Sequence, residues 1–425
     1  MSDQEYKIQQ YFRKLWPLCR SITGNDLRKS FEILQEIIPL QLYEVPSGTR
    51  VFDWEIPLEW NIEDAWLECP NGSIICKFKE NNLHVVNYSI PVNSELSWEQ
   101  LEPHLYTVPA LPNAVPYITS YYKDHWGFCL SENAKNALPK NGIYKAVIKS
   151  EKKPGSLTYG EYVLPGKSEK EILFSSYLCH PSMAVNELSG PLVLSFLYDK
   201  ISKIPERRYT YRFVIAPETI GIIAYLSRVG QKLLQNLEAG YVITCVGHEG
   251  KYTYKRSRQG NSLADRIAEH VLHYEDVEKE ILDFAVGGSD ERQFCAPGFN
   301  FPVGSLMRTM YKQYPEYHTS FDNESILSYK GINETVDMYF RLVRALEINQ
   351  KYTGKVQYCE PFLGKRDLYP SEASWQKQNA SLYDLLHFLA YADGERELLE
   401  VAEKQQKSIL EFEGIVSICR DQNLI

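Results

Sequence analysis

The sequence lacks the features that mark membrane, secreted and nucleic-acid-binding proteins. No apolar run approaches the ~20 uncharged residues that a membrane helix needs. Residues 1–16 have no basic cap followed by an apolar stretch, so we expect no secretory signal. Lys and Arg number 46 against 55 Asp and Glu, a net charge of −9 at pH 7. An acidic chain is unsuited to general nucleic-acid binding, so we expect neither nucleic acid nor a membrane as a partner.

Paired cysteines are also missing. The nine cysteines are odd in number and scattered, and no two form a CxxC pair. This distribution argues against both a disulfide framework and a thiolate zinc knuckle, and it favours reduced thiols in a cytoplasmic protein. The composition, 44% hydrophobic and 24% charged, is globular and excludes a disordered chain. At roughly 150 residues per domain, 425 residues predict two to three domains.

The middle of the chain alternates buried strands with helices. Apolar strands are predicted at 171–180, 210–218, 240–247 and 301–309, with helices at 190–201, 219–234 and 334–350. This alternation predicts an α/β fold with a mostly parallel sheet flanked by helices and connected by right-handed crossovers.

The flanking segments have other patterns. Residues 5–40 read as helix interrupted by a turn at 23–26, and residues 64–78 read as a β-hairpin. Three helical segments near the C-terminus have the size of a winged-helix module. We therefore predict a catalytic domain (1–47 and 116–352), a small β-rich insert (48–115) and a C-terminal helical, winged-helix-like domain (353–425).

Polar residues fall where the predicted strands end. His180 and Glu218 close two buried strands, and His318 follows a third. Asn186 and Glu187 lie between the first strand and its helix. Ligands of open parallel sheets bind outside the carboxyl ends of the strands, so we expect these side chains to share one site.

Two imidazoles and a carboxylate are the ligand set of a catalytic zinc that keeps a position open for water. Such an ion lowers the pKa of its water to about 7 and polarises a carbonyl group. A further carboxylate, Glu218, would act as the general base. Two simpler interpretations stay open: Glu218 as the cap of the helix that follows it, and Glu187 as a solvated residue of a first helical turn.

The sequence resembles the zinc aminopeptidase (clan MH) superfamily, and more closely a bacterial aminopeptidase-like family with a small inserted domain and a C-terminal winged helix. The resemblance covers nearly the whole chain. The matching segments are SYLCHPSMAVNELSG, APETIGIIAYL, YVITCVG, YKRSR, GGSDERQFCAPGFNFPVGSLMRT and EYHTSFDN.

The resemblance implies roles for five residues. His180 is similar to the family's first metal-binding His, and His318 to its last. Asn186 stands where the superfamily has a metal-bridging Asp. Glu218 matches the first Glu of the aminopeptidases' Glu-Glu pair, the general base, and Asp290 matches an Asp that orients groups near the site.

The departures from the superfamily pattern predict one zinc ion per chain rather than two. Thr219 stands where one private metal ligand is expected, and Thr244 stands where the other is expected. Asn186 is a poor ligand because it is neutral, so we expect the longer Glu187 beside it to replace the missing Asp.

An aminopeptidase also needs groups that receive the substrate. Acidic candidates for its α-ammonium are Asp290, Glu291 and Glu316. Arg292 and Arg308 would instead pair with a carboxylate, or serve as structural partners of those acids. Tyr311 and Tyr317 are candidates to donate to a developing oxyanion.

Three functions remain open from the sequence. The first is a zinc hydrolase with aminopeptidase-like chemistry on a peptide or small amide. The second cleaves a non-peptide amide, such as an acylated amino sugar, and the third is a non-catalytic binding or regulatory module. In the tail, residues 355–425, 12 acidic residues outnumber eight basic ones, which favours packing or homo-oligomer formation over DNA binding.

Overall fold

A computed structural model describes residues 1–368 and 375–425. The chain divides into two compact units, Met1–Ala264 with Glu278–Asp337 and Asp265–Val277 with Met338–Ile425. Within the described ranges, no helix is long and apolar enough to cross a membrane.

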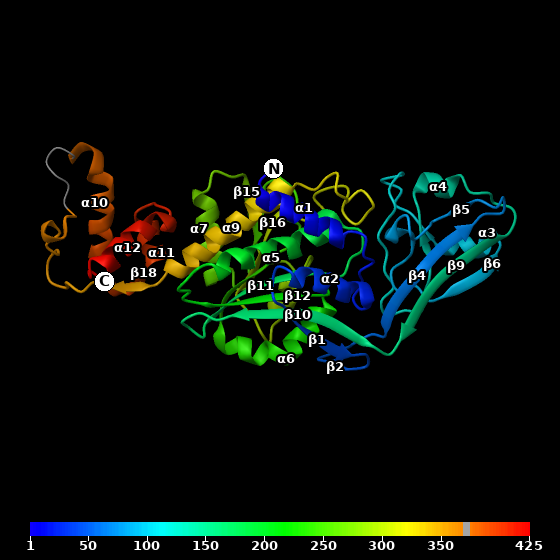
Figure 1. The fold of residues 1–425 in the computed structure, drawn as a ribbon, viewed down its shortest axis with the longest axis horizontal. Helices are drawn as coiled ribbons and strands as arrows, with labels where there is room; N and C mark the ends of the chain where they lie inside the picture. The colour runs from blue at the N-terminus through cyan, green and yellow to red at the C-terminus, as the bar shows by residue number, and fades with distance from the viewer. Residues whose placement is uncertain (369–374) are drawn as a thin grey trace. The chain divides into compact units, whose positions relative to one another are not determined.

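An eight-stranded sheet forms the centre of the first unit (Figure 1). Its order is β1-β10-β12-β11-β13-β16-β14-β15. The strands are β1 (Gln41–Pro46), β10 (Ser156–Leu164), β12 (Thr210–Ala216), β11 (Glu171–Tyr177), β13 (Leu237–Val242), β16 (Val303–Arg308), β14 (Tyr252–Lys255) and β15 (Lys279–Leu282). The central strands β12, β11, β13 and β16 run parallel, whereas β1 and β10 join antiparallel at one side.

The central strands are predominantly apolar and buried on both faces. All seven residues of β11 are buried, as expected for a parallel strand covered on both sides. Helix α5 (Ser189–Ser202) and helix α6 (Ile220–Asn236) cover opposite faces of the sheet (Figure 1). The predicted mostly parallel α/β fold is confirmed.

The N-terminal segment is less helical than predicted: the first helix ends at Leu15, before the predicted turn at 23–26, and the second begins within that turn. Helix α1 (Asp3–Leu15) and helix α2 (Asn25–Gln35) are separated by a segment that includes Gly24. Gly24 has φ of +105°, and a Cβ there would lie 2.4 Å from the Trp60 carbonyl oxygen. Only glycine fits this close approach.

The β-rich insert has a sheet of its own, in the order β5-β4-β9-β6. Strand β4 (Glu59–Glu68) pairs along its length with β9 (Tyr144–Lys153), so a strand beyond the predicted limits of 48–115 completes this sheet. Those limits stay a prediction. The shorter elements nearby are β2 (Arg50–Val51), β3 (Trp54–Glu55), β5 (Ile74–Ile75), β6 (Val92–Leu96), α3 (Trp98–Leu101), β7 (Leu105–Tyr106), β8 (Phe128–Cys129) and α4 (Glu132–Asn136).

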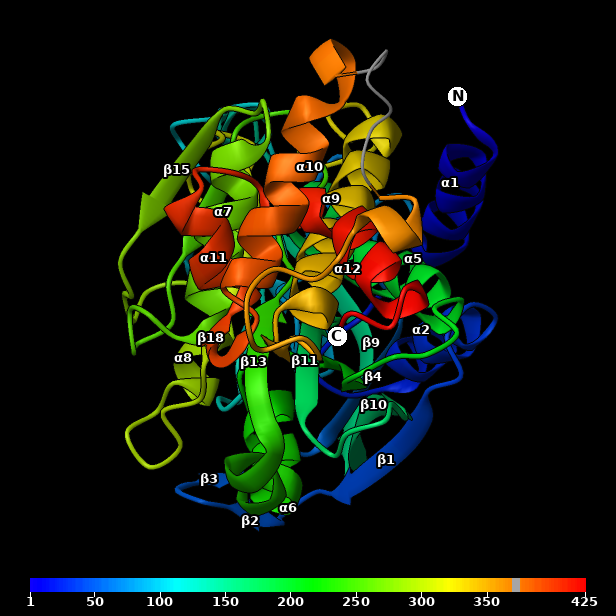
Figure 2. The same cartoon turned by 90° about the vertical axis from the view of Figure 1, so that its left-hand side faces the viewer.

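The second unit combines helices with a short antiparallel ribbon. The ribbon pairs β17 (Lys351–Thr353) with β18 (Asp393–Glu397). Figure 2 shows this unit from the side of its helices α10 (Trp375–Ala390), α11 (Leu398–Lys404) and α12 (Glu413–Asp421). Helix α7 (Leu263–Tyr274) and the end of α9 (Tyr329–Ile348) complete the unit. On α7, Nε2 of His270 accepts the backbone N–H of Ile409 at 2.9 Å.

Candidate active site

Three side chains from distant segments meet beyond the carboxyl ends of the central strands. His180 follows β11, Glu218 follows β12, and His318 lies in the loop after β16. The ring centroids of His180 and His318 are 5.4 Å apart, and Nε2 of His180 lies 3.8 Å from Oε2 of Glu218. With Zn–N distances of about 2.1 Å and tetrahedral angles, two imidazoles on one ion have centroids about 5 Å apart. The two rings are therefore within reach of one ion.

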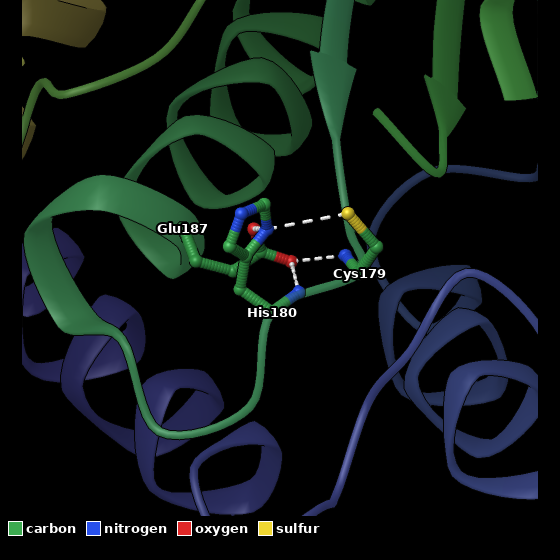
Figure 3. A group of neighbouring side chains, drawn as sticks. All are labelled: Cys179, His180 and Glu187. Atoms are coloured by element: carbon green, nitrogen blue, oxygen red, sulfur yellow. Dashed lines mark hydrogen bonds and ion pairs between the residues drawn. The ribbon is translucent and has the colours of Figure 1, made fainter. Parts of the chain in front are cut away.

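Glu187 lies behind the ring of His180, on its Nδ1 side. It sits in a π-helical turn (Ala184–Leu188) and is buried. Its Oε1 accepts the backbone N–H groups of Cys179 and of His180, the latter at 2.8 Å, while Oε2 lies 2.9 Å from Nδ1 of His180 (Figure 3). That contact is close, although it is not aligned as a hydrogen bond. Because a carboxylate oxygen repels a nitrogen lone pair, we infer that the ring proton sits on Nδ1, which leaves Nε2 free.

A second group of potential ligand atoms lies on this same Nδ1 side. Atoms of Cys179, His180 and Glu187 lie within 4.8 Å of one another. Burial and the charge of Glu187 hold the pKa of the Cys179 thiol well above its usual range, so the sulfur stays protonated and ligates poorly. The Cys179 sulfur also accepts the Glu218 backbone N–H at 3.3 Å. Protein contacts thus already occupy the Nδ1 side, whereas the Nε2 side faces Glu218.

The turn that presents Glu218 is strained. Thr219 has φ of 62° and ψ of −81°. The Ile220 backbone N–H donates to the Glu218 carbonyl at 2.8 Å. Together these features define a γ-turn with positive φ, the rarer and more strained of the two γ-turn types. Two residues hold it: Asp290 accepts the Thr219 backbone N–H at 2.8 Å, and Arg292 donates to the Thr219 hydroxyl at 2.8 Å. Strain of this kind concentrates at functional sites.

The Glu218 side chain is 24% exposed. Burial raises the pKa of its carboxyl, and the charges of His180 and Arg292 partly offset that rise. A raised carboxyl pKa suits a general base that must later release its proton.

His318 supplies a neutral imidazole with an unused nitrogen. Burial, and then the charge of His180, lowers its pKa to about 3. Its ring stacks on that of Tyr317, with centroids 3.9 Å apart, and its buried Nε2 has no hydrogen-bond partner. A buried nitrogen without a partner costs free energy unless a ligand completes it. For His180, burial lowers the pKa, but Glu187 and Glu218 raise it by more, so the net shift is upward.

A cavity of about 660 Å³ opens beside these groups. Its wall includes rings from the β-rich part of the unit. The Tyr117 ring lies 4.9 Å from that of His180 and 5.4 Å from that of His318, and its hydroxyl is 2.7 Å from that of Tyr121. The lining residues are Ile22, Trp54, Tyr117, Ile118, Thr119, Tyr121, Tyr122, Cys179, His180, Glu218, Thr219, Ile220, Arg292 and His318.

Asn186 is buried beside the site but is not part of this lining. Its Oδ1 accepts the Tyr177 hydroxyl at 2.9 Å, and its Nδ2 has no hydrogen-bond partner. Thr244 in turn donates to the Tyr177 hydroxyl at 2.7 Å. Asn186 and Thr244 therefore share one buried polar cluster through Tyr177.

Other predicted site residues also lie outside the cavity lining. Asp290 is buried and accepts the Thr219 backbone N–H, and the Tyr317 ring stacks on that of His318. Glu291 forms a buried ion pair with Lys255, which also donates to the Tyr311 hydroxyl at 2.8 Å.

The hydrogen-bonding groups of Tyr311 and Arg308 are already engaged within the protein. The Tyr311 hydroxyl donates to the Gly287 carbonyl at 3.0 Å. Arg308 donates to Glu334 at 2.7 Å and to the Gly250 carbonyl at 3.0 Å. In the present arrangement neither residue has a group directed at the cavity.

Sequence reasoning missed two buried residues that support the site. Asp322 accepts the backbone N–H groups of Ala184, Val185 and Asn186 at 3.1, 2.6 and 3.0 Å, and so anchors the turn that carries Glu187. Burial raises its pKa to about 6, although these N–H groups oppose the rise. Its position in the segment EYHTSFDN was the one available signal.

Arg20 is the second such residue. Its Nε donates to the His180 carbonyl at 3.2 Å, and its guanidinium is fully buried. Nothing in the local sequence around Arg20 indicates this role.

Comparison with known proteins gives a consistent result. A family profile described as "Domain of unknown function (DUF4910)" matches residues 9–349, and one described as "winged helix-turn-helix" matches residues 350–425. A Clostridium acetobutylicum protein is 43% identical over 409 residues, covering 96% of this chain and 93% of the relative. Its name assigns it, provisionally, to polysaccharide biosynthesis and gives it an aminopeptidase-like domain.

Two solved structures share the fold. A crystal structure from Clostridium acetobutylicum, provisionally named a peptidase, is 40% identical with a TM-score of 0.91, and covers 99% of this chain and 96% of that one. A zinc aminopeptidase from Bacillus subtilis has a TM-score of 0.55 at 12% identity, covering 81% of this chain and 94% of that one. The latter likeness concerns the fold alone. The expected aminopeptidase-like fold and C-terminal winged helix are confirmed.

Proposed function

Because the chain belongs to the DUF4910 family and has an aminopeptidase-like, hydrolase-like scaffold, we propose that it is a zinc-dependent hydrolase of a peptide or related amide bond. One observation carries this proposal: His180, His318 and Glu218, more than 30 residues apart from one another in sequence, converge beside one cavity.

In this proposal Nε2 of His180 and Nε2 of His318 would hold a single zinc ion. The unpartnered, neutral nitrogen of His318 supports the assignment, since ligating imidazoles must be unprotonated. Zinc is favoured because imidazole nitrogens in an open site suit it. When bound, the ion would supply Lewis-acid polarisation and lower the pKa of a water molecule.

Glu187 has a different role here from the one expected from the sequence. Its carboxylate lies at Nδ1 and binds two backbone N–H groups, so we assign it to orienting His180 rather than to direct ligation. A carboxylate that binds the non-ligating ring nitrogen of a metal-binding histidine fixes the tautomer of the ring and raises its basicity. Asn186, the alternative ligand, is placed in the Tyr177 cluster.

Glu218 moves the proton. Its carboxylate lies beside the imidazoles and, among the described residues, is the only carboxylate that lines the cavity. It takes a proton from the attacking water and returns it to the leaving nitrogen, as general acid–base catalysis requires.

The Tyr117–Tyr121 pair supplies an oxyanion donor. The two hydroxyls carry two hydrogens, and their mutual contact uses one of them. The second hydrogen has no acceptor among the described residues and remains free to donate to a developing oxyanion.

A second candidate function keeps this machinery but acts on an acylated amino sugar. Trp54 and Tyr122 line the cavity with aromatic rings, each more than a third exposed, and apolar ring faces suit sugar rings. The name of the Clostridium acetobutylicum relative mentions polysaccharide biosynthesis. Aminoacyl-anilides and acylated amino sugars, tested side by side, distinguish the two candidates.

We extend the proposal to the acid-rich C-terminal unit, which we assign to packing or self-association rather than DNA binding. A cytoplasmic location remains a prediction from the scattered, unpaired cysteines.

The test combines metal analysis with one substitution. Purified protein should bind about one zinc per chain, and Glu218→Gln should keep the metal while losing roughly 10²–10⁴-fold in turnover. Protein that has no zinc affinity and no hydrolytic activity would support the non-catalytic binding module instead. A Glu218→Gln variant as active as the wild type would refute the assigned base.

A further inference from the structure

The charges that line the cavity do not suit a free amine. Among the described residues of its wall, Glu218 is the only carboxylate and Arg292 the only Lys or Arg. The acids expected to receive an α-ammonium lie elsewhere: Asp290 and Glu291 are buried outside the lining, and Glu316 is not part of it. With Glu218 committed to proton transfer, no acid remains to receive the amine of an aminopeptidase substrate.

Arg292 has donors to spare. One Nη2 hydrogen goes to the Thr219 hydroxyl at 2.8 Å, while Nε is buried without a hydrogen-bond partner. Within the described chain, no carboxylate oxygen lies within 4.0 Å of its guanidinium nitrogens. A guanidinium presents five N–H donors in a planar fork that matches a carboxylate. Its charge acts on Glu218 and Asp290 only without direct contact, and a partly buried cation with no direct ion pair is incompletely compensated.

Three buried cations of this unit are paired with carboxylates, whereas a fourth, Arg20, donates to backbone carbonyls. Arg212 contacts Glu161 and Glu171, and Lys255 contacts Glu291. Arg308 likewise contacts Glu334. Arg292 differs from them in having an open cavity where a partner acid would be.

We propose that Arg292 binds a carboxylate of the substrate, so that the substrate is an N-acyl amino acid, or the C-terminal residue of a peptide, rather than a chain with a free α-amine. Arg292 contacts the residue directly after Glu218, so a carboxylate bound there lies close to the base. In such a substrate the carboxylate and the nitrogen of the scissile amide belong to the same amino acid. A carboxylate bound at Arg292 therefore places that amide near Glu218. The inference rests on the proposed function, which makes Glu218 the base and the bound molecule a substrate.

The apolar residues of the cavity wall indicate which side chain the substrate carries. Ile22, Ile118 and Ile220 line the cavity together with aromatic rings. Such a wall accommodates an apolar or aromatic side chain. N-acetyl-L-phenylalanine therefore combines the features that the cavity selects.

Binding to metal-free protein tests the proposal, because zinc itself attracts carboxylates. Isothermal titration calorimetry compares N-acetyl-L-phenylalanine, N-acetyl-L-phenylalaninamide and L-phenylalaninamide. Wild-type protein should bind the carboxylate at least 10-fold more tightly than either amide. Arg292→Gln should abolish that preference, and Arg292→Lys should retain part of it. Arg13→Gln is the matched control, since Arg13 is an exposed arginine of α1 whose partner is Glu324.

Each outcome decides the question. Equal binding of the three ligands, preference for L-phenylalaninamide, no binding of any of them, or an intact preference in Arg292→Gln would each overturn the proposal. Failure of the hydrolase proposal looks different: zinc-loaded protein would cleave none of the amides, while the Arg292-dependent preference persisted. Retention of zinc by Arg292→Gln shows that the substitution spares the metal site.

Discussion

Glu187→Gln tests how His180, the proposed zinc ligand, is held. The substitution keeps the shape of the side chain but replaces one carboxylate oxygen by an amide N–H₂ group. In the protein, one oxygen accepts two backbone N–H groups and the other faces Nδ1 of His180 (Figure 3). Glutamine has a single side-chain oxygen. It can therefore either accept the backbone N–H groups or face Nδ1 of His180, but not both.

The two orientations of the amide have different costs. If its oxygen accepts the backbone N–H groups of Cys179 and His180, its N–H₂ faces Nδ1 and favours the tautomer with the proton on Nε2, which cannot bind a metal. If it turns the other way, two buried N–H groups lose their acceptor, at about 1–3 kcal/mol for each. We expect the first orientation, and a loss of about 10–100-fold in zinc affinity, the usual effect of removing such a supporting carboxylate.

Chelator-competition titration of zinc measures this loss, with circular dichroism as the check on folding. Asn186→Ala is the matched control on the same turn, and it should weaken zinc less, since Asn186 contacts Tyr177. A dissociation constant for Glu187→Gln within about threefold of wild type would refute the reasoning. A greater loss in Asn186→Ala would show that the neighbouring side chain is the ligand.

Two further predictions address other parts of the molecule. Replacing both Tyr117 and Tyr121 by Phe should lower kcat about 10²–10³-fold with zinc content unchanged, and steady-state kinetics with unaltered kcat would rule out the oxyanion role. Burial lowers the pKa of His270 to about 4, below the ordinary 6.5. Between these two pH values the unfolded chain binds more protons than the folded chain. The free energy of unfolding therefore falls as the pH drops from 6.5 towards 4. The loss at pH 5 is about 2 kcal/mol. Denaturant unfolding at pH 7 and pH 5 should show a drop that His270→Gln reduces by about that amount, and an equal drop in both proteins would contradict the assignment.

Much of the fold could be predicted from the sequence because its signals are local. Strand β11 contains the apolar run Ile172–Phe174, and the turn before α2 is marked by Gly24 and polar neighbours. The alternation of such strands with helices restricts the topology to a parallel sheet with right-handed crossovers. A second rule, that open parallel sheets bind ligands outside the carboxyl ends of their strands, placed His180, Glu218 and His318 together.

The surroundings of those residues could not be predicted in the same way. Tyr117 and Tyr121 follow a proline-rich connector whose path depends on contacts far along the chain. Arg20 and Asp322 act through backbone groups more than 130 residues away, and no local pattern records such contacts. The side of the imidazole on which Glu187 lies depends on the π-helical turn, which periodicity does not reveal.

The sequence by itself determined the fold class of the protein, the order of its main elements and the residues proposed to carry chemistry, because hydrophobic periodicity and turn residues act over short distances. The tertiary structure alone decided which nitrogen of His180 faces the cavity, which predicted acids are buried elsewhere, and that Arg292 is left without a carboxylate partner. These properties depend on distances of a few ångströms between segments far apart in the chain, and such distances are set only when the whole core packs.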